Sequence, residues 1–512
     1  MSKFAELVRD IFSLDPTAQA AEFEGTWWSW GDLAAIGAAI EAKLSAAGLG
    51  KDARVAGMLR NRSEMAGALV HVLASGRCLV TLNPSLPDDK LGEEIRILKP
   101  GAIFALQEDW ARPGVIAAAR EIGCLGLVLT QDRADPVRVV AGLGKPDLAK
   151  LRAFAEDDIG VEMLTSGTTG TPKRIPLKRR SIEQSVLGAA VYDGRKQGEP
   201  PRLRDQVVLV NAPFTHIAGI FALMNAIMAG RKVAVLPRFS VEGWVGAVER
   251  HGLKVASAPP AALRMILDAN VPRARLKSLL AFRTGTAPLD PDLADAFYDR
   301  YGIPVLQNYS ATEFAGAGAG WTLADFKTHY PAKRGSVGRI NPDIEARIVD
   351  VETNAPLARG DQGLLEIRAP HLGDGRSWMR TTDLAVLDED DFLYIKGRAD
   401  NAIIRGGFKV FPEDVITAMQ AHPAIREAAV TGLPDERLGQ IPVAAFVTRA
   451  GKTAPGEAEL RESLRQSLLA YQVPVHIFAL DELPRTPSMK VSQPELKALL
   501  ARKVEELGVG AA

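Results

Sequence analysis

The strongest constraint on the fold is a regular alternation of short apolar runs with amphipathic segments, which begins near residue 54. The runs predict strands at 54–59, 78–82, 102–106 and 125–129, and the segments between them predict helices at 62–74, 88–98 and 113–121. Strands that are apolar along their whole length are buried on both faces, and intervening helices make their connections parallel. We therefore predict a doubly wound α/β sheet. Ahead of it, Ser29 and Asp32 have the spacing of a helix capping box.

The alternation returns later, with strands expected at 159–164, 207–210, 232–236, 254–257, 279–283 and 305–309. Two α/β lobes are therefore expected before residue 320. Short strands between residues 335 and 368 indicate a small β subdomain, and from about residue 401 strands and helices alternate over the length of one small domain. Division into domains is required in any case, because a chain of 512 residues is too long for one core.

The charge balance excludes several kinds of partner. Lys plus Arg and Asp plus Glu both total 62, so there is no basic field to attract nucleic acid or an anionic membrane. No signal peptide is apparent, and the apolar stretch at 214–230 is shorter than the about 20 residues of a membrane span, which predicts a buried helix. Cys78 and Cys124 fit a reducing compartment and have no metal-ligand spacing. We expect a soluble, cytoplasmic protein with small-molecule partners.

A run rich in hydroxyl groups and glycine extends from Thr165 to Lys173, directly after the strand expected at 159–164. Glycines let backbone N–H groups approach an anion, hydroxyls add hydrogen bonds, and the lysine places a positive charge on phosphate. It is not a Walker loop, because Pro172 occupies the position of the second glycine. On this run alone, a phosphate-binding loop and an ordinary polar loop are equally compatible.

Further short motifs have both a functional and a plain structural interpretation. Residues 309–313 follow a predicted strand, where ligands bind in open α/β folds, and their Tyr, Thr and Glu can stack on a base and hold magnesium. They are equally compatible with a polar loop. Asp383 can accept both hydroxyls of a ribose. Paired glycines at 406–407 indicate a close approach or a β-bulge. Lys490, on a proline-bounded loop, means little alone.

Together these motifs form an ordered set: TSGTTGTPK at 165, YSATE at 309, TTD at 381, GRAD at 397, IIRGGFKVFPEDV at 403 and PRTPSMK at 484. The set resembles the adenylate-forming enzyme superfamily, which includes acyl- and aryl-CoA ligases, peptide-synthetase adenylation domains and firefly-type luciferases. The resemblance runs from about residue 30 to residue 497.

The resemblance implies contacts to ATP and coenzyme A. The β- and γ-phosphates would be gripped by Thr165, Ser166, Gly167, Thr168, Thr169, Gly170 and Lys173. Tyr309 would stack on adenine, in a site that also includes Gly285, Thr286, Ala287, Asn308 and Ser310. Thr312 would contact a phosphate, and Glu313 would bind the magnesium ion. Asp383 and Arg398 would hold the ribose. Gly406 and Gly407 would face the pantetheine channel.

It also implies the catalytic residues and the domain plan. Lys490 would be the catalytic lysine, Glu313 would act through magnesium, and His216 would gate the carboxylate pocket. From the residues alone, His216 is read as a hydrogen-bonded buried histidine. Asp400 would be the hinge between an N-terminal domain at 1–399, made of two doubly wound lobes and a β subdomain, and a mobile α+β domain at 400–512.

The implied activity is that of an AMP-forming acyl-CoA synthetase, an acid-thiol ligase. A carboxylate is a poor acyl donor, so ATP converts it into acyl-AMP with release of pyrophosphate, and coenzyme A then takes the acyl group. An adenylation enzyme that loads a carrier protein, a luciferase-like oxygenase and a nucleotide-binding regulator without turnover are the alternatives. A homodimer, the pathway and the populated domain orientation are left open by the sequence.

The chain departs from the family at a few positions. Family members usually have glycine where this chain has Ser310, Thr382 and Met489, and often where it has Arg174. The substitutions at 310, 382 and 489 are the only support for an inactive regulator, whereas the retained residues Lys490, Glu313, Asp383 and Arg398 favour activity. Most residues expected around the acid, at 216, 220–225, 284–286 and 308–311, are small or neutral. This composition favours a bulky aryl, cyclic or otherwise apolar acid over a short diacid, without identifying it.

Overall fold

The computed structural model describes residues 2–152, 158–165, 173–192, 200–311, 314, 316–486 and 488–507. The chain divides into two compact units. The described residues of unit 1 lie within Met1–Thr165, Lys173–Gly318 and Thr322–Thr328, and those of unit 2 within Ala319–Trp321 and His329–Ala512. The predicted domain boundary at 399/400, with its hinge at Asp400, falls inside unit 2 and stays a prediction.

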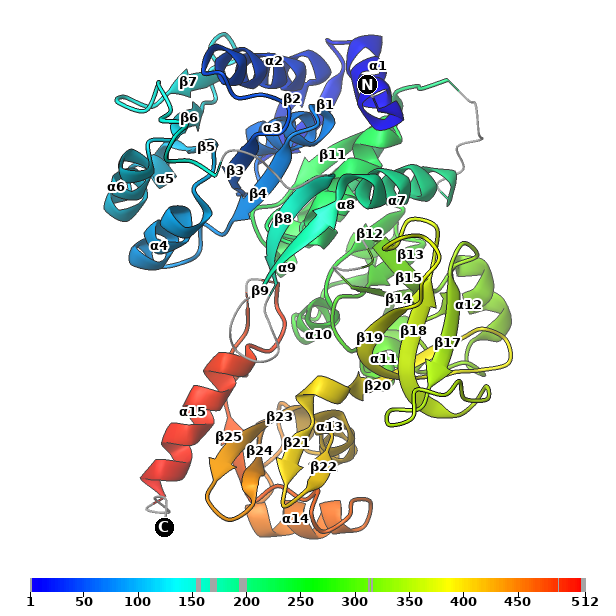
Figure 1. Ribbon diagram of the computed structural model, residues 1–512. Helices are drawn as coiled ribbons and strands as arrows, with labels where there is room; N and C mark the ends of the chain where they lie inside the picture. The colour runs from blue at the N-terminus through cyan, green and yellow to red at the C-terminus, as the bar shows by residue number, and fades with distance from the viewer. Residues whose placement is uncertain are drawn as a thin grey trace. The chain divides into compact units, whose positions relative to one another are not determined.

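Unit 1 contains the predicted doubly wound sheet, whose strand order is β7-β6-β5-β3-β4-β8-β9 (Figure 1). The inner strands β3, β4, β5, β6 and β8 are parallel, whereas the edge strands β7 and β9 are antiparallel to their neighbours. The strands are β3 (Arg54–Met58), β4 (Cys78–Leu82), β5 (Ala102–Leu106), β6 (Leu125–Leu129), β7 (Val137–Val139), β8 (Ile159–Thr165) and β9 (Lys173–Lys178).

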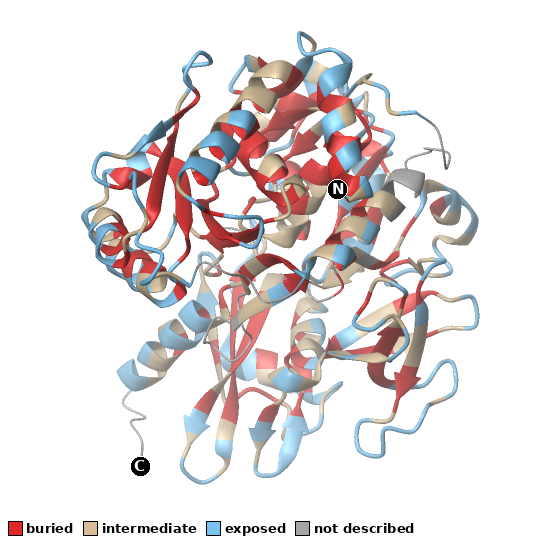
Figure 2. Ribbon diagram, turned by 45° about the horizontal axis from the view of Figure 1, so that its top comes forward, coloured by how far each residue is buried: buried red, intermediate tan, exposed pale blue. Residues whose placement is uncertain are grey.

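Both faces of this sheet are buried, as the continuous apolar runs predict (Figure 2). Along β5, Ala102, Phe104 and Leu106 belong to one hydrophobic cluster, and Ile103 and Ala105 to another. The accompanying helices are α1 (Lys3–Leu14), α2 (Trp30–Ala46), α3 (Ser63–Ala74), α4 (Asp88–Leu98), α5 (Gln107–Trp110) and α6 (Pro113–Ile122). The predicted capping box at the start of α2 is confirmed.

The second lobe is not built from consecutive residues, contrary to the simple repeat expected. Its first sheet has the order β10-β11-β1-β2. Two of these strands, β1 and β2, come from the N-terminal part of the chain and were not predicted from the sequence. A second sheet contains parallel β12, β13 and β14. These elements are β1 (Gln19–Phe23), β2 (Thr26–Ser29), α7 (Arg179–Tyr192), β10 (Arg204–Val210), α8 (Ile217–Met228), β11 (Arg231–Val235), α9 (Val241–His251), β12 (Val255–Ser257), α10 (Pro260–Asp268), η1 (Arg273–Leu276), β13 (Ala281–Thr284), α11 (Pro291–Tyr301) and β14 (Val305–Ala311).

The segment after β14 leads into unit 2, which holds the predicted β subdomain and the C-terminal α+β region. β17 to β20 form an antiparallel meander, and β21 to β25 form a mixed sheet. Two elements after β14 are divided between the units, namely β15 (Gly316–Gly320) and α12 (Leu323–His329). The elements of unit 2 are β16 (Arg339–Ile340), β17 (Glu345–Val349), β18 (Gln362–Arg368), β19 (Met379–Leu387), β20 (Leu393–Arg398), η3 (Ala399–Asn401), β21 (Ile403–Arg405), β22 (Phe408–Val410), α13 (Pro412–Gln420), β23 (Ile425–Asp435), β24 (Gly439–Thr448), α14 (Glu457–Arg465), β25 (His476–Leu480) and α15 (Gln493–Glu506).

Candidate active site

The loop after β13 and the end of β14 lie side by side in unit 1. The two strands are parallel neighbours with Thr284 opposite Gln307, so Gly285, the first residue after β13 at its carboxyl edge, comes level with Asn308 on β14. A Cβ atom on Gly285 would lie 2.1 Å from Asn308 Oδ1. Only glycine allows this approach of backbone to side chain. The structure therefore brings together two residues expected in the adenine site.

The same edge carries two further signs of a ligand site. Thr286 has a left-handed backbone with φ of 68°, which is an outlier for a β-branched residue and typical of functional sites. Thr286 is exposed, and Ala287 is half-buried. Thr284 is 3% exposed, and its Oγ1 has no hydrogen-bond partner in the described part of the chain. A buried hydroxyl without a partner costs about 1–3 kcal/mol, which a ligand can recover.

Tyr309 and Ser310 lie on β14 and do not follow it, because the strand continues to Ala311, past the end that the sequence predicted. The Tyr309 ring meets Phe314 edge-on, with centroids 5.7 Å apart. A Cβ atom on Gly318 would lie 3.4 Å from this ring, at ordinary van der Waals contact, so Gly318 borders Tyr309 on β15. Thr312 and Glu313 lie outside the described residues.

His216 is the N-cap residue of α8, and its backbone N–H donates to the Pro213 carbonyl at 2.9 Å. Its side chain is half-buried, so the interpretation of a fully buried histidine is wrong. On α8 the half-buried positions recur with helical spacing at Ala218, Phe221, Ala222 and Asn225. This stripe forms part of the face expected to line the acid pocket.

The phosphate loop is framed by an antiparallel hairpin. β8 and β9 pair with Thr165 opposite Lys173, and with Leu164 opposite Arg174. The two ends of the run from Thr165 to Lys173 are therefore held against each other. Ser166, Gly167, Thr168, Thr169 and Gly170 lie outside the residues that the structure describes.

In unit 2 the residues expected at the ribose are close together. Asp383 on β19 is directly opposite Arg398 on β20. Arg398 donates from Nε and Nη2 to the two carboxylate oxygens of Asp400, each at 2.9 Å. A Cβ atom on Gly397 would meet Glu413 Oε2 at 2.7 Å. The family motif GRAD thus forms a compact charged turn.

Lys490 lies on a tight loop, where the Thr486 N–H donates to the Lys490 carbonyl at 2.8 Å and the Met489 N–H donates to the Thr486 carbonyl at 2.8 Å. Burial lowers the pKa of Lys490, and the charge of Arg398 lowers this pKa further. The structure therefore places the expected catalytic lysine within electrostatic range of the expected ribose site. Lys490 is half-buried, whereas a lysine on a loop is usually exposed and solvated.

Gly406 and Gly407 form the turn between β21 and β22, with φ of 58° and 89°. Two successive left-handed residues are typical of two-residue hairpin turns, which favour glycine. The turn explains both glycines without a β-bulge, and both are exposed. Their contact with pantetheine stays a prediction.

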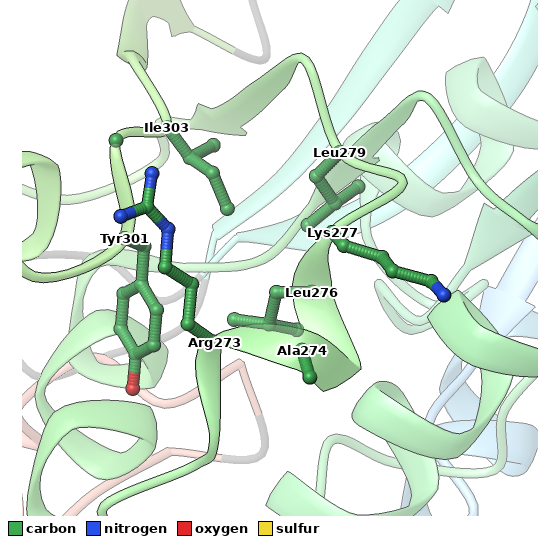
Figure 3. A pocket seen from close by; sticks show the side chains of 8 residues that line it. Arg273, Ala274, Leu276, Lys277, Leu279, Tyr301 and Ile303 are labelled. Carbon is green, nitrogen blue, oxygen red and sulfur yellow. The ribbon is translucent and has the colours of Figure 1, made fainter.

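A cavity of about 450 Å³ lies away from these residues, near the amino ends of β13 and β14. Its lining includes Arg273, Lys277, Leu279, Tyr301 and Ile303 (Figure 3). The Tyr301 hydroxyl is already used, because it donates to the Val271 carbonyl at 3.1 Å. Gly285 follows the opposite, carboxyl end of β13, so this cavity is not the candidate active site.

Comparison with known proteins identifies the family. The AMP-binding enzyme family matches residues 12–375, and the AMP-binding enzyme C-terminal domain matches residues 417–490. This chain belongs to the AMP-binding enzyme family. The resemblance to adenylate-forming enzymes is confirmed.

Relatives of this AMP-binding enzyme cover nearly the whole chain. A 4-coumarate–CoA ligase 5 of Oryza sativa subsp. japonica is 29% identical over 93% of this chain and 90% of its own length. A 2-succinylbenzoate–CoA ligase of Geobacillus kaustophilus is 29% identical, covering 90% of each chain. The crystal structure of ATP-bound MatB from Rhodopseudomonas palustris has a TM-score of 0.79 at 25% identity, with 97% of this chain and 98% of that chain covered.

Sequence reasoning missed a second set of charged residues in this AMP-binding enzyme. Glu413, next to Gly397, has a pKa raised by burial. Beneath the phosphate hairpin, Glu162 is paired with Arg54, and Arg174 with Glu94. One signal was present, since Glu162 interrupts an otherwise apolar strand, and a buried charge requires a partner.

Across the described ranges, no helix is long and apolar enough to cross a membrane. Within those ranges, no group of three or more His, Cys, Asp or Glu side chains is arranged to hold a metal ion. The predicted magnesium residue, Glu313, is outside them. Cys78 and Cys124 are buried and unpaired with each other, as expected.

Proposed function

We propose that this AMP-binding enzyme is an ATP-dependent carboxylate:CoA ligase. The observation that carries the proposal is the arrangement around Arg398, which lies opposite Asp383 and near Lys490, a lysine whose pKa is lowered by burial and then by the charge of Arg398. A desolvated cation beside a ribose-binding pair is what adenylation needs, because charge develops at the α-phosphate. The family match over both domains supports the same assignment.

The proposed reaction has two steps. A carboxylate oxygen attacks the α-phosphorus of ATP, the bond to the β-phosphate oxygen breaks, and pyrophosphate leaves. The thiol of coenzyme A then attacks the acyl carbon, loses its proton to solvent and expels AMP. Lys490 stabilises the charge in the first step, and rotation about Asp400 exchanges it for Gly406 and Gly407 in the second.

The residues present fit a nucleotide. The Gly285–Asn308 contact leaves no room for a side chain, and Thr284 Oγ1 offers a buried hydroxyl that lacks a partner among the described residues. Thr165 to Lys173 would hold the outer phosphates, and Glu313 would hold magnesium. When bound, magnesium neutralises phosphate charge.

We further propose a bulky aryl acid as the substrate. By name, two relatives act on 4-coumarate and 2-succinylbenzoate, which both carry an aromatic ring. The stripe of Ala218, Phe221 and Ala222 on α8 offers a half-buried apolar surface beside His216. A ring can pack against such a surface, whereas a second short carboxylate gains nothing from it.

The proposal includes a cytoplasmic enzyme, in keeping with its buried thiols, and a homodimer as the assembly to be tested by light scattering. A carrier protein as acyl acceptor is the second candidate, because coenzyme A and a carrier present the same thiol chemistry.

The test measures pyrophosphate release with 4-coumarate, 2-succinylbenzoate, cyclohexanecarboxylate, octanoate and malonate, each with and without coenzyme A. We expect the fastest release with an aryl acid, and multiple turnovers only with coenzyme A. Fastest release with malonate would reject the apolar pocket. Nucleotide binding without release from any acid would favour the regulator.

A further inference from the structure

Arg174 is the residue that replaces a common family glycine directly after the phosphate-loop lysine, and its side chain does not point into solvent. It is the second residue of β9, the edge strand of the seven-stranded sheet. Its side chain is 19% exposed, and that of its partner Glu94 is 14% exposed. An arginine on an edge strand has solvent available, so this inward arrangement needs an explanation.

Arg174 connects three elements of unit 1 to β9. Its Nη1 donates to the Glu162 carbonyl of β8 at 3.1 Å, and its Nη2 donates to the Thr81 carbonyl of β4 at 3.3 Å. Nη2 also donates to the carboxylate of Glu94 on α4. One guanidinium therefore ties the strand that begins with Lys173 to two strands and a helix.

A second ion pair strengthens the same region. Arg54, which is fully buried, donates to both carboxylate oxygens of Glu162, from Nε at 2.8 Å and from Nη2 at 2.5 Å. Its Nη1 donates to the Leu98 carbonyl at the end of α4. Together, Arg54, Glu162, Arg174 and Glu94 form a charged cluster that joins β3, β8, β9 and α4.

We propose that Arg174 is a positioning residue that fixes the paired residues Thr165 and Lys173, from which the phosphate-binding run starts and at which it ends, by tying this end of the hairpin to α4 through Glu94. The inference rests on the proposed function. Leu164 and Arg174 form the register pair next to Thr165 and Lys173, so movement of Arg174 moves the base of the loop. Since Glu94 neutralises Arg174, the residue acts through geometry and not by adding charge at the phosphates.

The chain offers a matched control, Arg112, which pairs with the same helix, α4. Arg112 pairs with Asp88 of α4 at 3.4 Å and donates to the carbonyls of Pro84 and Leu86 at 2.9 and 2.6 Å. Its side chain is 20% exposed. Arg112 thus makes the same kinds of contact, an ion pair to α4 and hydrogen bonds to two backbone carbonyls, at nearly the same exposure, but from the start of α6 instead of the phosphate hairpin.

The test compares binding of ATP and of AMP by calorimetry, because AMP lacks the phosphates that the loop would hold. For Arg174→Ala and Glu94→Gln we expect ATP affinity to fall about ten-fold, the scale of one lost charge-assisted contact, with AMP affinity unchanged. Arg174→Lys should recover part of the loss. Arg112→Ala should lower the melting temperature while leaving the ratio of ATP to AMP affinity at its wild-type value.

Two results would overturn this role. One is a ratio of ATP to AMP affinity that stays at the wild-type value in folded Arg174→Ala. If that variant does not fold, the same unchanged ratio in both Arg174→Lys and Glu94→Gln would overturn the role. The other is tighter ATP binding by Glu94→Gln, which would mean that Arg174 acts by its charge. Failure of the unmodified enzyme to bind either nucleotide would instead reject the proposed function, and this inference with it.

Discussion

Two loops, one in each unit, each hold a non-glycine residue in left-handed backbone, but they are stabilised by different means. Thr286, with φ of 68°, follows β13 on a loop where Gly285 packs against Asn308. Met489, with φ of 64°, precedes Lys490 in unit 2. The Met489 carbonyl accepts a hydrogen bond from Arg485 Nη1 at 3.0 Å, and Arg485 is paired with Glu427.

A left-handed L-residue costs about 1–2 kcal/mol of backbone strain. The two loops offset this strain in different ways. The Thr286 loop depends on packing at the end of a parallel strand. The Met489 loop depends on an ion pair whose side chains are 29% and 22% exposed. A change of charge should therefore loosen the lysine loop, whereas only a change of volume should disturb the loop after β13.

The largest expected effect separates the two loops by reaction step. Lys490→Ala removes the cation of the lysine loop, so we expect adenylation, measured as pyrophosphate release, to fall about 100-fold or more. Conversion of preformed acyl-AMP into thioester should continue, because in the proposed reaction Lys490 acts only in the first step. Lys452→Ala, at an exposed position of unit 2, is the control. Equal loss of both steps would reject the role of Lys490.

A change of volume addresses the other loop. Gly285→Ala places a Cβ atom 2.1 Å from Asn308 Oδ1, so the adenine side of the site must shift. We expect kcat/KM for ATP to fall about 10- to 100-fold. Gly246→Ala in α9, where a Cβ atom has nothing within 4 Å, should leave it unchanged. An unaffected Gly285→Ala enzyme would show that this edge does not bind the nucleotide.

A change of charge should loosen only the lysine loop. Glu427→Gln weakens the hold on Arg485, and we expect adenylation to slow about ten-fold, equivalent to ~1.4 kcal/mol. The thioester step from preformed acyl-AMP should keep its rate. Stopped-flow measurement of both steps checks this. If thioester formation slows equally, the ion pair supports unit 2 as a whole and not the loop.

The smallest effects concern backbone strain. Thr286→Gly and Met489→Gly should each stabilise their own loop by about 1 kcal/mol, because glycine adopts left-handed backbone freely. Hydrogen exchange of the two loops measures this locally. If Thr286→Gly stabilises its loop and Met489→Gly does not, the hydrogen bond from Arg485 already offsets the strain at Met489 fully.

Much of the fold could be predicted from local pattern. The strands at 78–82, 102–106 and 125–129 match to the residue, because burial on both faces leaves an unmistakable apolar run. β15 was missed, since its sequence GAGAG has no β-branched or aromatic residue. β1 was missed because its parallel partner, β11, lies about 200 residues away, and local sequence does not report such a pairing.

The candidate site shows the same limit. The family motifs predicted Gly285 and Asn308 at the adenine and Asp383 and Arg398 at the ribose. In the structure each of these two pairs lies close together, and the roles assigned to them stay predictions. The Arg174–Glu94 pair could not be predicted, because 80 residues separate its members. The pair depends on the tertiary structure, because a buried charge pairs with an oppositely charged residue that the fold brings close to it.

In the proposed reaction a carboxylate oxygen attacks the α-phosphorus of ATP. The direct measurement uses an aryl acid labelled with ¹⁸O in its carboxylate, together with ATP and coenzyme A, and follows the products by mass spectrometry. We predict one ¹⁸O atom in each AMP formed and none in pyrophosphate. Label in inorganic phosphate, with ADP as the nucleotide product, would mean attack at the γ-phosphorus and would contradict this account.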